Sequence, residues 1–591
     1  MKHTFVSTVI LTAALLTSPA AGDAAAFVEV LEAAEQGDAQ AQFNLGVCYE
    51  TGDGVEKDFT QAASWYRKAA EQGLAHAQYN LGRCYSFGNG VDKDAAQAFA
   101  WYQKAAQQGL AHAQNNLGVC YKTGEGVKQD LEKAVELYKK SAEQGYARAQ
   151  CNLGQSYFHG HGVKQDGAKA FAWLKKAADQ NDAEAQADLG TCYLNGFGVK
   201  KDAKKAVQWY RKSAKQGHAK AQFNLGYCYS EGLGVEQSDT QAVAWYKKAA
   251  LQGSAEGQYN LGVRYANGTG VKQSHAKAVE LYKQAAEQGY ADAQNNLGTC
   301  YLRGNGVKQN PAQAVAWFEK AAQQGLAIAQ YNLAFSYANG IGVKKDAAKT
   351  FKWFHRAADQ GLAAAQRDLA VCYDNGIGVS KDPAEALKWF TKAAQQNDAD
   401  AQLYLGIRYQ YGKGVKPDAA KAVEWYRKSA QQGLAQAQRN LGICYASGNG
   451  VKRDTAQAFA WFEKAARQGD KFGQYNLALC YANGDGVKKD ADQAATWYTK
   501  SAEQGYAQAQ DSLALCYFQG TGVDKDDAKT FEWFKKAADQ GLAQAQHNLG
   551  ACYENGVGVE KDLDEALTWY KKAAGQGYED AVEKLKQLEE K

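Results

Sequence analysis

The sequence predicts an all-α solenoid of about fifteen helix-turn-helix repeats, each 36 residues long. Three observations carry this prediction. The chain of 591 residues realigns with itself every 36 residues from Ala41 onward, without insertion or deletion. Each copy holds two apolar patterns with helical spacing, and a pair of glycines separates them. Two short helices cannot bury their apolar faces alone, so we expect the copies to stack around one continuous core.

The first copy, residues 41–76, shows the pattern of both helices. Ala41, Leu45 and Tyr49 recur at intervals of four residues, which places them on one face of the first helix. The second helix carries apolar residues at i, i+3, i+4, i+7 and i+8: Ala62, Trp65, Tyr66, Ala69 and Ala70. The two patterns predict a helical hairpin with one apolar side in every copy.

The positions between the apolar patterns indicate how each helix begins and ends. Gly52 and Gly54 recur in all fifteen copies, as a turn with positive φ requires. Asp58 is a predicted N-cap of the second helix. Its replacements in other copies also favour N-caps: Ser238, Ser274 and Asn310. The second helix ends at Gly73, and two copies place asparagine, which tolerates a left-handed conformation, at that stop: Asn181 and Asn397.

Four segments make up the chain. Residues 1–22 have a basic start, an apolar run from Phe5 to Leu16 and a small-residue end, which is the outline of a secretory signal peptide. Residues 23–40 are a predicted N-terminal capping helix, residues 41–580 the fifteen repeats, and residues 581–591 a charged C-terminal capping helix. We therefore expect an exported protein that loses its first segment.

The charge balance limits the kinds of partner. The net charge is only +4 over the whole chain, so neither nucleic acid nor an anionic membrane surface is indicated. No apolar stretch approaches the roughly 20 residues that a membrane span needs. Lysine pairs such as Lys200–Lys201 and Lys344–Lys345 precede the second helix in several copies. They indicate a solvated edge or weak electrostatic binding to an anionic polymer.

Twelve features of the first copy resemble the Sel1-like repeat family, which is related to the tetratricopeptide repeat. They are Ala41, Leu45, Gly46, Tyr49, the Gly52–Val55 turn, Asp58, Ala62, Trp65, Tyr66, Ala69, Ala70 and Gly73. The resemblance implies a right-handed superhelical solenoid. It also implies a scaffold or adaptor without enzymatic activity or cofactor, exported to the periplasm or secreted by a bacterium, whose partners are envelope, extracellular or host proteins.

A cysteine-rich branch of that family has been linked to penicillin-binding or β-lactamase activity, so a serine enzyme is the alternative. Ser274 to Lys277 matches S-x-x-K and Lys122 to Gly124 matches K-T-G, but no S-D-N triplet occurs. Ser274 also reads as the N-cap of its helix. We therefore interpret both matches as coincidence.

Most cysteines and all tryptophans occupy fixed repeat positions. Eleven of the twelve cysteines share the position of Cys48, and all thirteen tryptophans share that of Trp65. Adjacent copies of one position lie about 10 Å apart, beyond disulfide range, so free thiols and core packing are predicted. His159 and His161 flank a glycine and are interpreted as loop residues, with a metal site as the alternative.

The surface predicted to bind partners is the concave side, which the first helices line in tetratricopeptide relatives. Its residues would stand at repeat positions 3, 4, 7, 10 and 11. Position 4 is asparagine in eleven copies: Asn44, Asn80, Asn116, Asn152, Asn224, Asn260, Asn296, Asn332, Asn440, Asn476 and Asn548. These amides either bind an extended peptide backbone or support the neighbouring repeat. Aromatic or imidazole anchors are predicted at Phe158, His159, Tyr227, Phe335, Tyr404 and Tyr411.

Three functional hypotheses follow. The first is a non-enzymatic exported scaffold that binds other proteins through this concave face. The second is the cell-wall-active serine enzyme. The third is a regulator that masks a single periplasmic partner.

Overall fold

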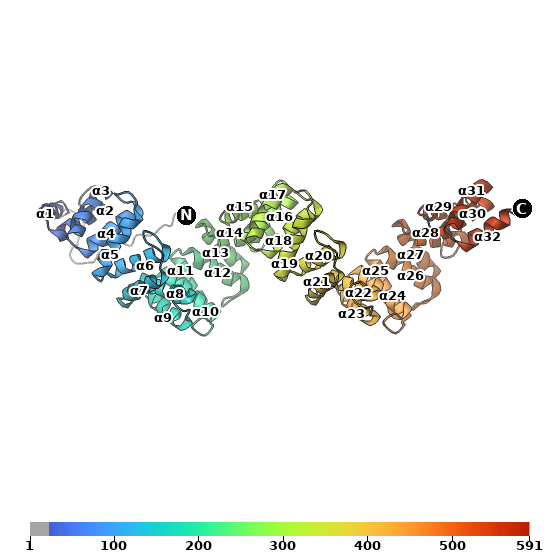
Figure 1. Cartoon of the computed structure of the whole chain (residues 1–591), viewed down its shortest axis with the longest axis horizontal. Coiled ribbons are helices and arrows are strands. Elements are labelled where there is room, and N and C mark those ends of the chain that lie inside the picture. Colours follow the sequence, from blue (N-terminus) through green and yellow to red (C-terminus); the bar gives the residue numbers. More distant parts are fainter. Residues whose placement is uncertain (1–22, 590–591) are drawn as a thin grey trace. The chain divides into compact units, whose positions relative to one another are not determined.

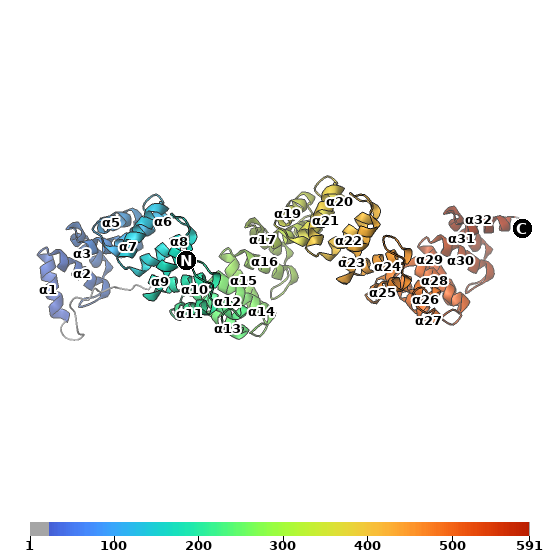
Figure 2. The same ribbon diagram turned by 90° about the horizontal axis from the view of Figure 1, so that it is seen from below.

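The computed structural model describes residues 23–589 and confirms the all-α repeat fold. Thirty-two helices and no strand occur in this part of the chain. Figures 1 and 2 show them as successive helical hairpins, and the main contacts link helices that are adjacent in sequence. The predicted signal peptide lies outside the described residues. Contacts divide the chain into two units, Met1–Tyr290 and Ala291–Lys591.

In the first unit, α1 is followed by seven hairpins. The even-numbered helices from α2 to α30 are the first helices of the repeats, called A helices below, and the odd-numbered helices from α3 to α31 are the B helices. Their bounds are α1 Asp23–Glu35, α2 Ala39–Thr51, α3 Phe59–Glu71, α4 Ala75–Phe87, α5 Ala95–Gln107, α6 Ala111–Thr123, α7 Leu131–Glu143, α8 Ala147–His159, α9 Gly167–Asp179, α10 Ala183–Asn195, α11 Ala203–Lys215, α12 Ala219–Glu231, α13 Asp239–Leu251, α14 Ala255–Asn267 and α15 His275–Glu287.

The second unit holds eight hairpins and the closing helix α32. The helices are α16 Ala291–Arg303, α17 Pro311–Gln323, α18 Ala327–Asn339, α19 Ala347–Asp359, α20 Ala363–Asn375, α21 Pro383–Gln395, α22 Ala399–Tyr411, α23 Ala419–Gln431, α24 Ala435–Ser447, α25 Thr455–Arg467, α26 Lys471–Asn483, α27 Ala491–Glu503, α28 Ala507–Gln519, α29 Asp527–Asp539, α30 Ala543–Asn555, α31 Leu563–Gly575 and α32 Glu579–Glu589.

The helix ends follow the capping chemistry read from the sequence. The Asp58 carboxylate accepts hydrogen bonds from the backbone amides of Thr60 and Gln61 at 2.8 and 3.0 Å. Gly52 ends α2 with φ of 82°, and its amide bonds the Cys48 carbonyl. The two asparagines at the end of the B helix, Asn181 and Asn397, both have φ of 69° and are the non-glycine residues with positive φ among residues 23–589.

The second glycine of the turn also packs against the preceding repeat within each unit. A Cβ atom added to Gly90 would lie 1.8 Å from the carbonyl oxygen of Phe59, the first residue of α3. The same approach joins Gly234 to Ala203, the first residue of α11. This position therefore needs glycine both for its positive φ and because no side chain fits between the repeats.

The core consists of alanine, leucine and one large buried residue per B helix, which is aromatic in every B helix of the described residues except α9, where it is Leu174. Tyr66 is fully buried, as are its counterparts in other repeats, whereas the preceding Trp65 is only half-buried. The ammonium of Lys68 lies 3.5 Å from the centre of the Trp65 ring, and the same pair recurs in most repeats. Tryptophan therefore packs at the outer edge of the core. The residue that follows it, Tyr66 in the first repeat, occupies the core position that was predicted for tryptophan.

A ladder of glutamines joins the helices, and one glutamine of each pair is buried. The Gln72 side-chain amide donates to Oε1 of Gln42 at 2.8 Å, and Gln42 in turn donates to the backbone carbonyl of Ala34 at 3.1 Å. The first of these bonds recurs in all fifteen repeats. Within each unit the buried amide is thereby satisfied while it ties an A helix to the preceding B helix, as Gln78 does to Ala70.

The cysteine thiols lie inside the repeats. Ten of the twelve cysteines are buried and the other two are half-buried. Burial raises the pKa of Cys192 and Cys228 to about 12 and about 11. Such thiols stay protonated near neutral pH, which makes them poor nucleophiles.

Candidate partner-binding face

The outward side of the A helices carries repeat positions 3, 4, 7, 10 and 11, and we call it the A-helix face. Half of the large apolar side chains that remain exposed in the described residues lie on it, and six of these seven are aromatic: Phe87, Tyr227, Phe335, Tyr404, Tyr411, Ile443 and Phe518. Exposed apolar residues on the B helices stand instead at helix ends, as Leu251 and Leu563 do. The A-helix face is therefore the richer surface in aromatic groups.

All seventeen predicted partner-binding residues lie on A helices. Phe87, Ile443 and Phe518 were not among the predicted residues, although they stand at positions 11, 7 and 10. Exposure of 58% for Phe87 shows that a helix end next to a turn leaves a large side chain free. The signal that would have found them is a large apolar residue at a position where most copies are small or polar.

Several of the predicted asparagines already have partners within the protein. Asn152 donates to Oδ1 of Asn115 at 2.8 Å, and Asn332 donates to Oδ1 of Asn295 at 2.9 Å, each in the preceding repeat. The remaining asparagines vary. Asn80, Asn116 and Asn440 face buried tyrosine hydroxyls. Asn44 and Asn260 form hydrogen bonds within their own helices, Asn548 bonds Asp511, and Asn296 accepts a hydrogen bond from Asn295. Asn224 and Asn476 are half-buried on the face.

One bond of this kind involves a buried carboxylate. Asn548 donates to Oδ1 of Asp511 at 3.0 Å, and Asp511 is only 4% exposed. Burial raises the pKa of Asp511 from its ordinary value of 3.8 to about 6, and the hydrogen bond from Asn548 lowers it in part. Equivalent positions in two other repeats hold asparagine, Asn115 and Asn295.

Replacing Asp511 by asparagine should therefore stabilise the protein at neutral pH. The folded-state pKa is raised, so the stability that protonated Asp511 contributes is present below pH 3.8 and is lost as the pH rises through about 6. Asp511→Asn, which stays neutral, should gain about 3 kcal/mol over the wild type at pH 8 and little at pH 4. Urea unfolding followed by circular dichroism at both pH values measures this; an equal difference at pH 4 and pH 8 would contradict it.

The aromatic anchors differ in how freely they project. Tyr411 is 66% exposed, whereas Tyr404, on the same helix, stacks on Phe390 with ring centres 4.9 Å apart. Phe158 is withdrawn against Phe197 at 4.7 Å. Tyr411 is thus the freest of these groups, and Tyr404 is held in one orientation by its contact with the core.

A polar cluster that the sequence analysis missed links α8, α10 and α12. Arg148 pairs with Glu184 at 2.6 Å, and Gln155 donates to both Glu184 and Asp188 at 2.7 and 2.8 Å. Lys220 pairs with Asp188 at 2.9 Å. The charged side chains at repeat position 36 therefore reach the A-helix face, where Lys220 of α12 meets Asp188, at position 4, on the preceding A helix α10.

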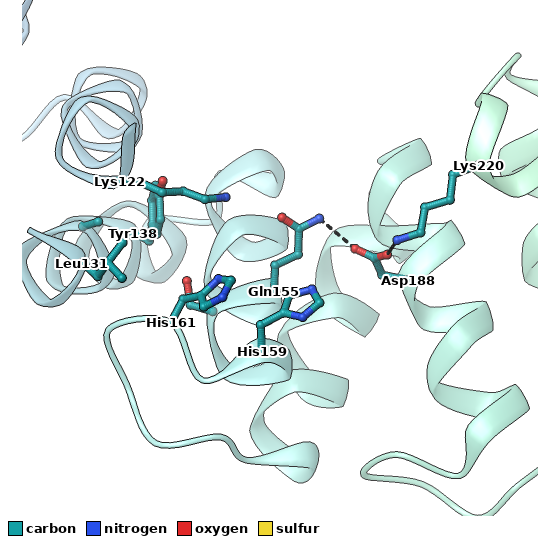
Figure 3. Close-up of a pocket in the computed structure, with 10 residues that line it drawn as sticks. Lys122, Leu131, Tyr138, Gln155, His159, His161, Asp188 and Lys220 are labelled. Carbon is teal, nitrogen blue, oxygen red and sulfur yellow. Dashed lines mark hydrogen bonds and ion pairs between the residues drawn. The ribbon is translucent and has the colours of Figure 1, made fainter. Parts of the chain in front are cut away.

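Beside this cluster the A-helix face is hollowed into a cavity of about 220 Å³ (Figure 3). Lys122, Gln155, Asp188 and Lys220 line it from the four A helices α6, α8, α10 and α12, His159 stands at the end of α8, and Tyr138 of α7 forms part of its wall. His159 stacks on His161 with ring centres 5.3 Å apart. Burial and the nearby His161 lower the pKa of His159, which keeps the imidazole neutral at neutral pH.

The two histidines lack the surroundings of a metal site in the described residues. No group of three histidine, cysteine or carboxylate side chains stands close enough there to hold a metal ion. Lysines flank the pair instead. This arrangement favours anions over metal cations.

The residues of the serine-enzyme motif have a structural role. Ser274 is the N-cap of α15, and its hydroxyl accepts from the backbone amide of Lys277 at 3.4 Å. Lys122 stands in α6, several hairpins earlier in the same unit.

In residues 23–589 no helix combines the length and apolar character needed to cross a bilayer.

Comparison with known proteins places the chain in a family. The model of the Sel1 repeat matches fifteen consecutive stretches between residues 39 and 578. The chain belongs to the Sel1 repeat family. A comparison with curated proteins gives no match.

Two solved structures are similar along much of the chain. One is c5321 from uropathogenic Escherichia coli, described as a protective antigen displaying an SLR fold; it is 34% identical over 90% of this chain and 97% of its own, with a TM-score of 0.50. The other is a Sel1 repeat protein from Oxalobacter formigenes, 34% identical over 52% of this chain and 89% of its own, with a TM-score of 0.42.

Proposed function

We propose that the protein is an exported, non-enzymatic scaffold that binds envelope, extracellular or host proteins through the A-helix face. The observation that carries the proposal is the concentration of exposed aromatic side chains on that face. Tyr411, Tyr404 and Phe335 lie on A helices of the second unit, and their exposure ranges from 40% to 66%. Aromatic groups of this size are enriched where proteins bind one another.

The structural demands of the repeat support this reading. The turn glycines, N-caps and glutamine ladder account for the residues that recur in every copy. None of these features requires an aromatic group at positions 4, 7 or 11. Residues freed from packing are the ones that a partner can select, as in other repeat proteins.

Export rests on residues 1–22 and on one relative. The first segment has the basic, apolar and small-residue regions of a signal peptide. The similar Escherichia coli protein is described as a protective antigen, which supports a location accessible to a host. A location outside the cytoplasm is compatible with envelope or host proteins as partners.

Crosslinking in native cells tests the binding face. The protein should capture specific partners, and the double variant Tyr404→Ala/Tyr411→Ala should lose them, because their loss removes exposed aromatic contact area worth about 2 kcal/mol or more. Captured proteins are identified by mass spectrometry. Thermal unfolding of the variant should remain cooperative, since both side chains lie at the surface.

A matched control is the double variant Leu251→Ala/Leu563→Ala, which removes exposed apolar groups from B helices. It should leave capture unchanged. Equal capture by all three proteins would contradict binding through the A-helix face. Loss of capture in the leucine variant alone would place the binding surface on the B helices.

A further inference from the structure

The cavity between α6 and α12 contains a lysine without a counterion. Figure 3 shows the Lys122 side chain extending across the cavity toward Gln155, with His159 and His161 beside it. Lys220 is already paired with Asp188, which also accepts from Gln155. Among residues 23–589, no carboxylate forms an ion pair with Lys122.

Tyr138, in the wall of the same cavity, is an exception among the buried tyrosines. Tyr66 donates its hydroxyl hydrogen to Glu50 at 2.5 Å, and Tyr570 donates to Glu554 at 2.7 Å. The residue sixteen positions before Tyr138 is Lys122, which cannot accept. The Tyr138 side chain is 1% exposed, and its hydroxyl has no hydrogen-bond partner in the described structure.

The charges in the cavity indicate the charge of the ligand that it would bind. Lys220 and Asp188 cancel, and the burial-lowered pKa of His159 keeps that ring neutral at neutral pH. One positive charge, on Lys122, is left over. A group with a single negative charge and two acceptor oxygens balances it and can also accept from Tyr138 or an imidazole N–H.

We propose that this cavity binds a carboxylate group, with Lys122 as its counterion and Tyr138, His159 and His161 as hydrogen-bond donors. The carboxylate belongs either to a protein, as a C-terminus or an acidic side chain, or to a small organic acid. The volume of about 220 Å³ holds one such group with a few atoms attached. The protein source rests on the proposed function, whereas the small-acid source does not.

Histidine-ring NMR of the full chain provides the test, with three probes. These are sodium acetate, the peptide Gly-Gly-Ala with a free C-terminus, and the same peptide as an amide. Acetate and the free-acid peptide should shift the ring signals of His159 and His161 in a saturable manner, and the amide should not. Tighter binding of the peptide than of acetate assigns the site to a protein carboxylate, and equal binding assigns it to a small acid.

Two charge-reversal variants make the test specific. Lys122→Glu gives Tyr138 the acceptor that Glu50 and Glu554 provide elsewhere, so it should fold normally and bind at least about tenfold more weakly. Lys200→Glu makes the same charge change at an exposed loop and should alter the affinity by less than about twofold.

Three results overturn the proposal: no saturable shift with either acid, equal shifts with the amide, or unchanged affinity in Lys122→Glu. These titrations use no protein partner. A negative titration beside intact partner capture would therefore reject the cavity alone, and a positive titration beside failed capture would reject the proposed scaffold function alone.

Discussion

Gly234→Ala is expected to destabilise the first unit by about 3 kcal/mol or more, because two costs add. The residue has φ of +71°, which a side chain disfavours, and its new Cβ would lie 2.2 Å from the backbone carbonyl oxygen of Ala203. Backbone atoms cannot yield as a flexible side chain can. The neighbouring repeats must therefore separate to admit one methyl group.

A second glycine in the same unit distinguishes the cost of the positive φ from the cost of the steric clash. Gly217 has φ of +88° and no atom within 4 Å of an added Cβ. Gly217→Ala should cost only about 1 kcal/mol, and Gly217→Asn less, because Asn181 stands at the same repeat position with φ of 69°. Urea unfolding followed by circular dichroism compares the variants. Equal losses for Gly234→Ala and Gly217→Ala would show that the close approach between repeats is absent.

Asp374→Ala is expected to destabilise the second unit by about 3 kcal/mol. Its partner Arg408 is 2% exposed, ion-pairs with Asp374 and donates to the carbonyls of Lys413 and Pro383 at 2.6 and 3.3 Å. Without Asp374 the guanidinium keeps its hydrogen bonds but loses the charge that balances it. A buried cation without a counterion is among the most costly defects in a folded protein.

The repeat supplies its own rescue for this defect. Arg408 stands where eleven copies carry cysteine, so Arg408→Cys restores the common residue. The double variant Asp374→Ala/Arg408→Cys should recover most of the stability lost in Asp374→Ala. Chemical unfolding of the two single variants and the double variant measures the coupling. Additive losses would mean that the ion pair does not hold these residues together.

The helices and their ends could be predicted because they depend on local sequence. Asp58, Gly52 and their substitutes in other copies act through neighbouring backbone groups, so fifteen repetitions of one pattern identify them. The glutamine ladder was visible as Gln42 and Gln72 in every copy, yet no local rule assigns a role to a buried glutamine. Its bonds join residues of different helices.

The cavity could not be predicted, because it depends on contacts among helices from several hairpins. It depends on Lys122, His159, Asp188 and Lys220, whose side chains meet only after four hairpins have stacked. The exposed anchors were predicted in part, because position within the repeat gave the face. Local packing decided how far each one projects, as the contact of Tyr404 with Phe390 shows.

A photoreactive side chain at a single position tests the binding face most directly. Benzoylphenylalanine placed at position 411 on α22, or at position 563 at the start of α31, would be activated by light in cells that contain the native partners. Both native residues are exposed, at 66% and 57%. Adducts that form from position 411 and not from position 563 are the predicted result. Adducts from position 563 alone, or equal yields from both positions, would contradict a scaffold that binds through its A helices.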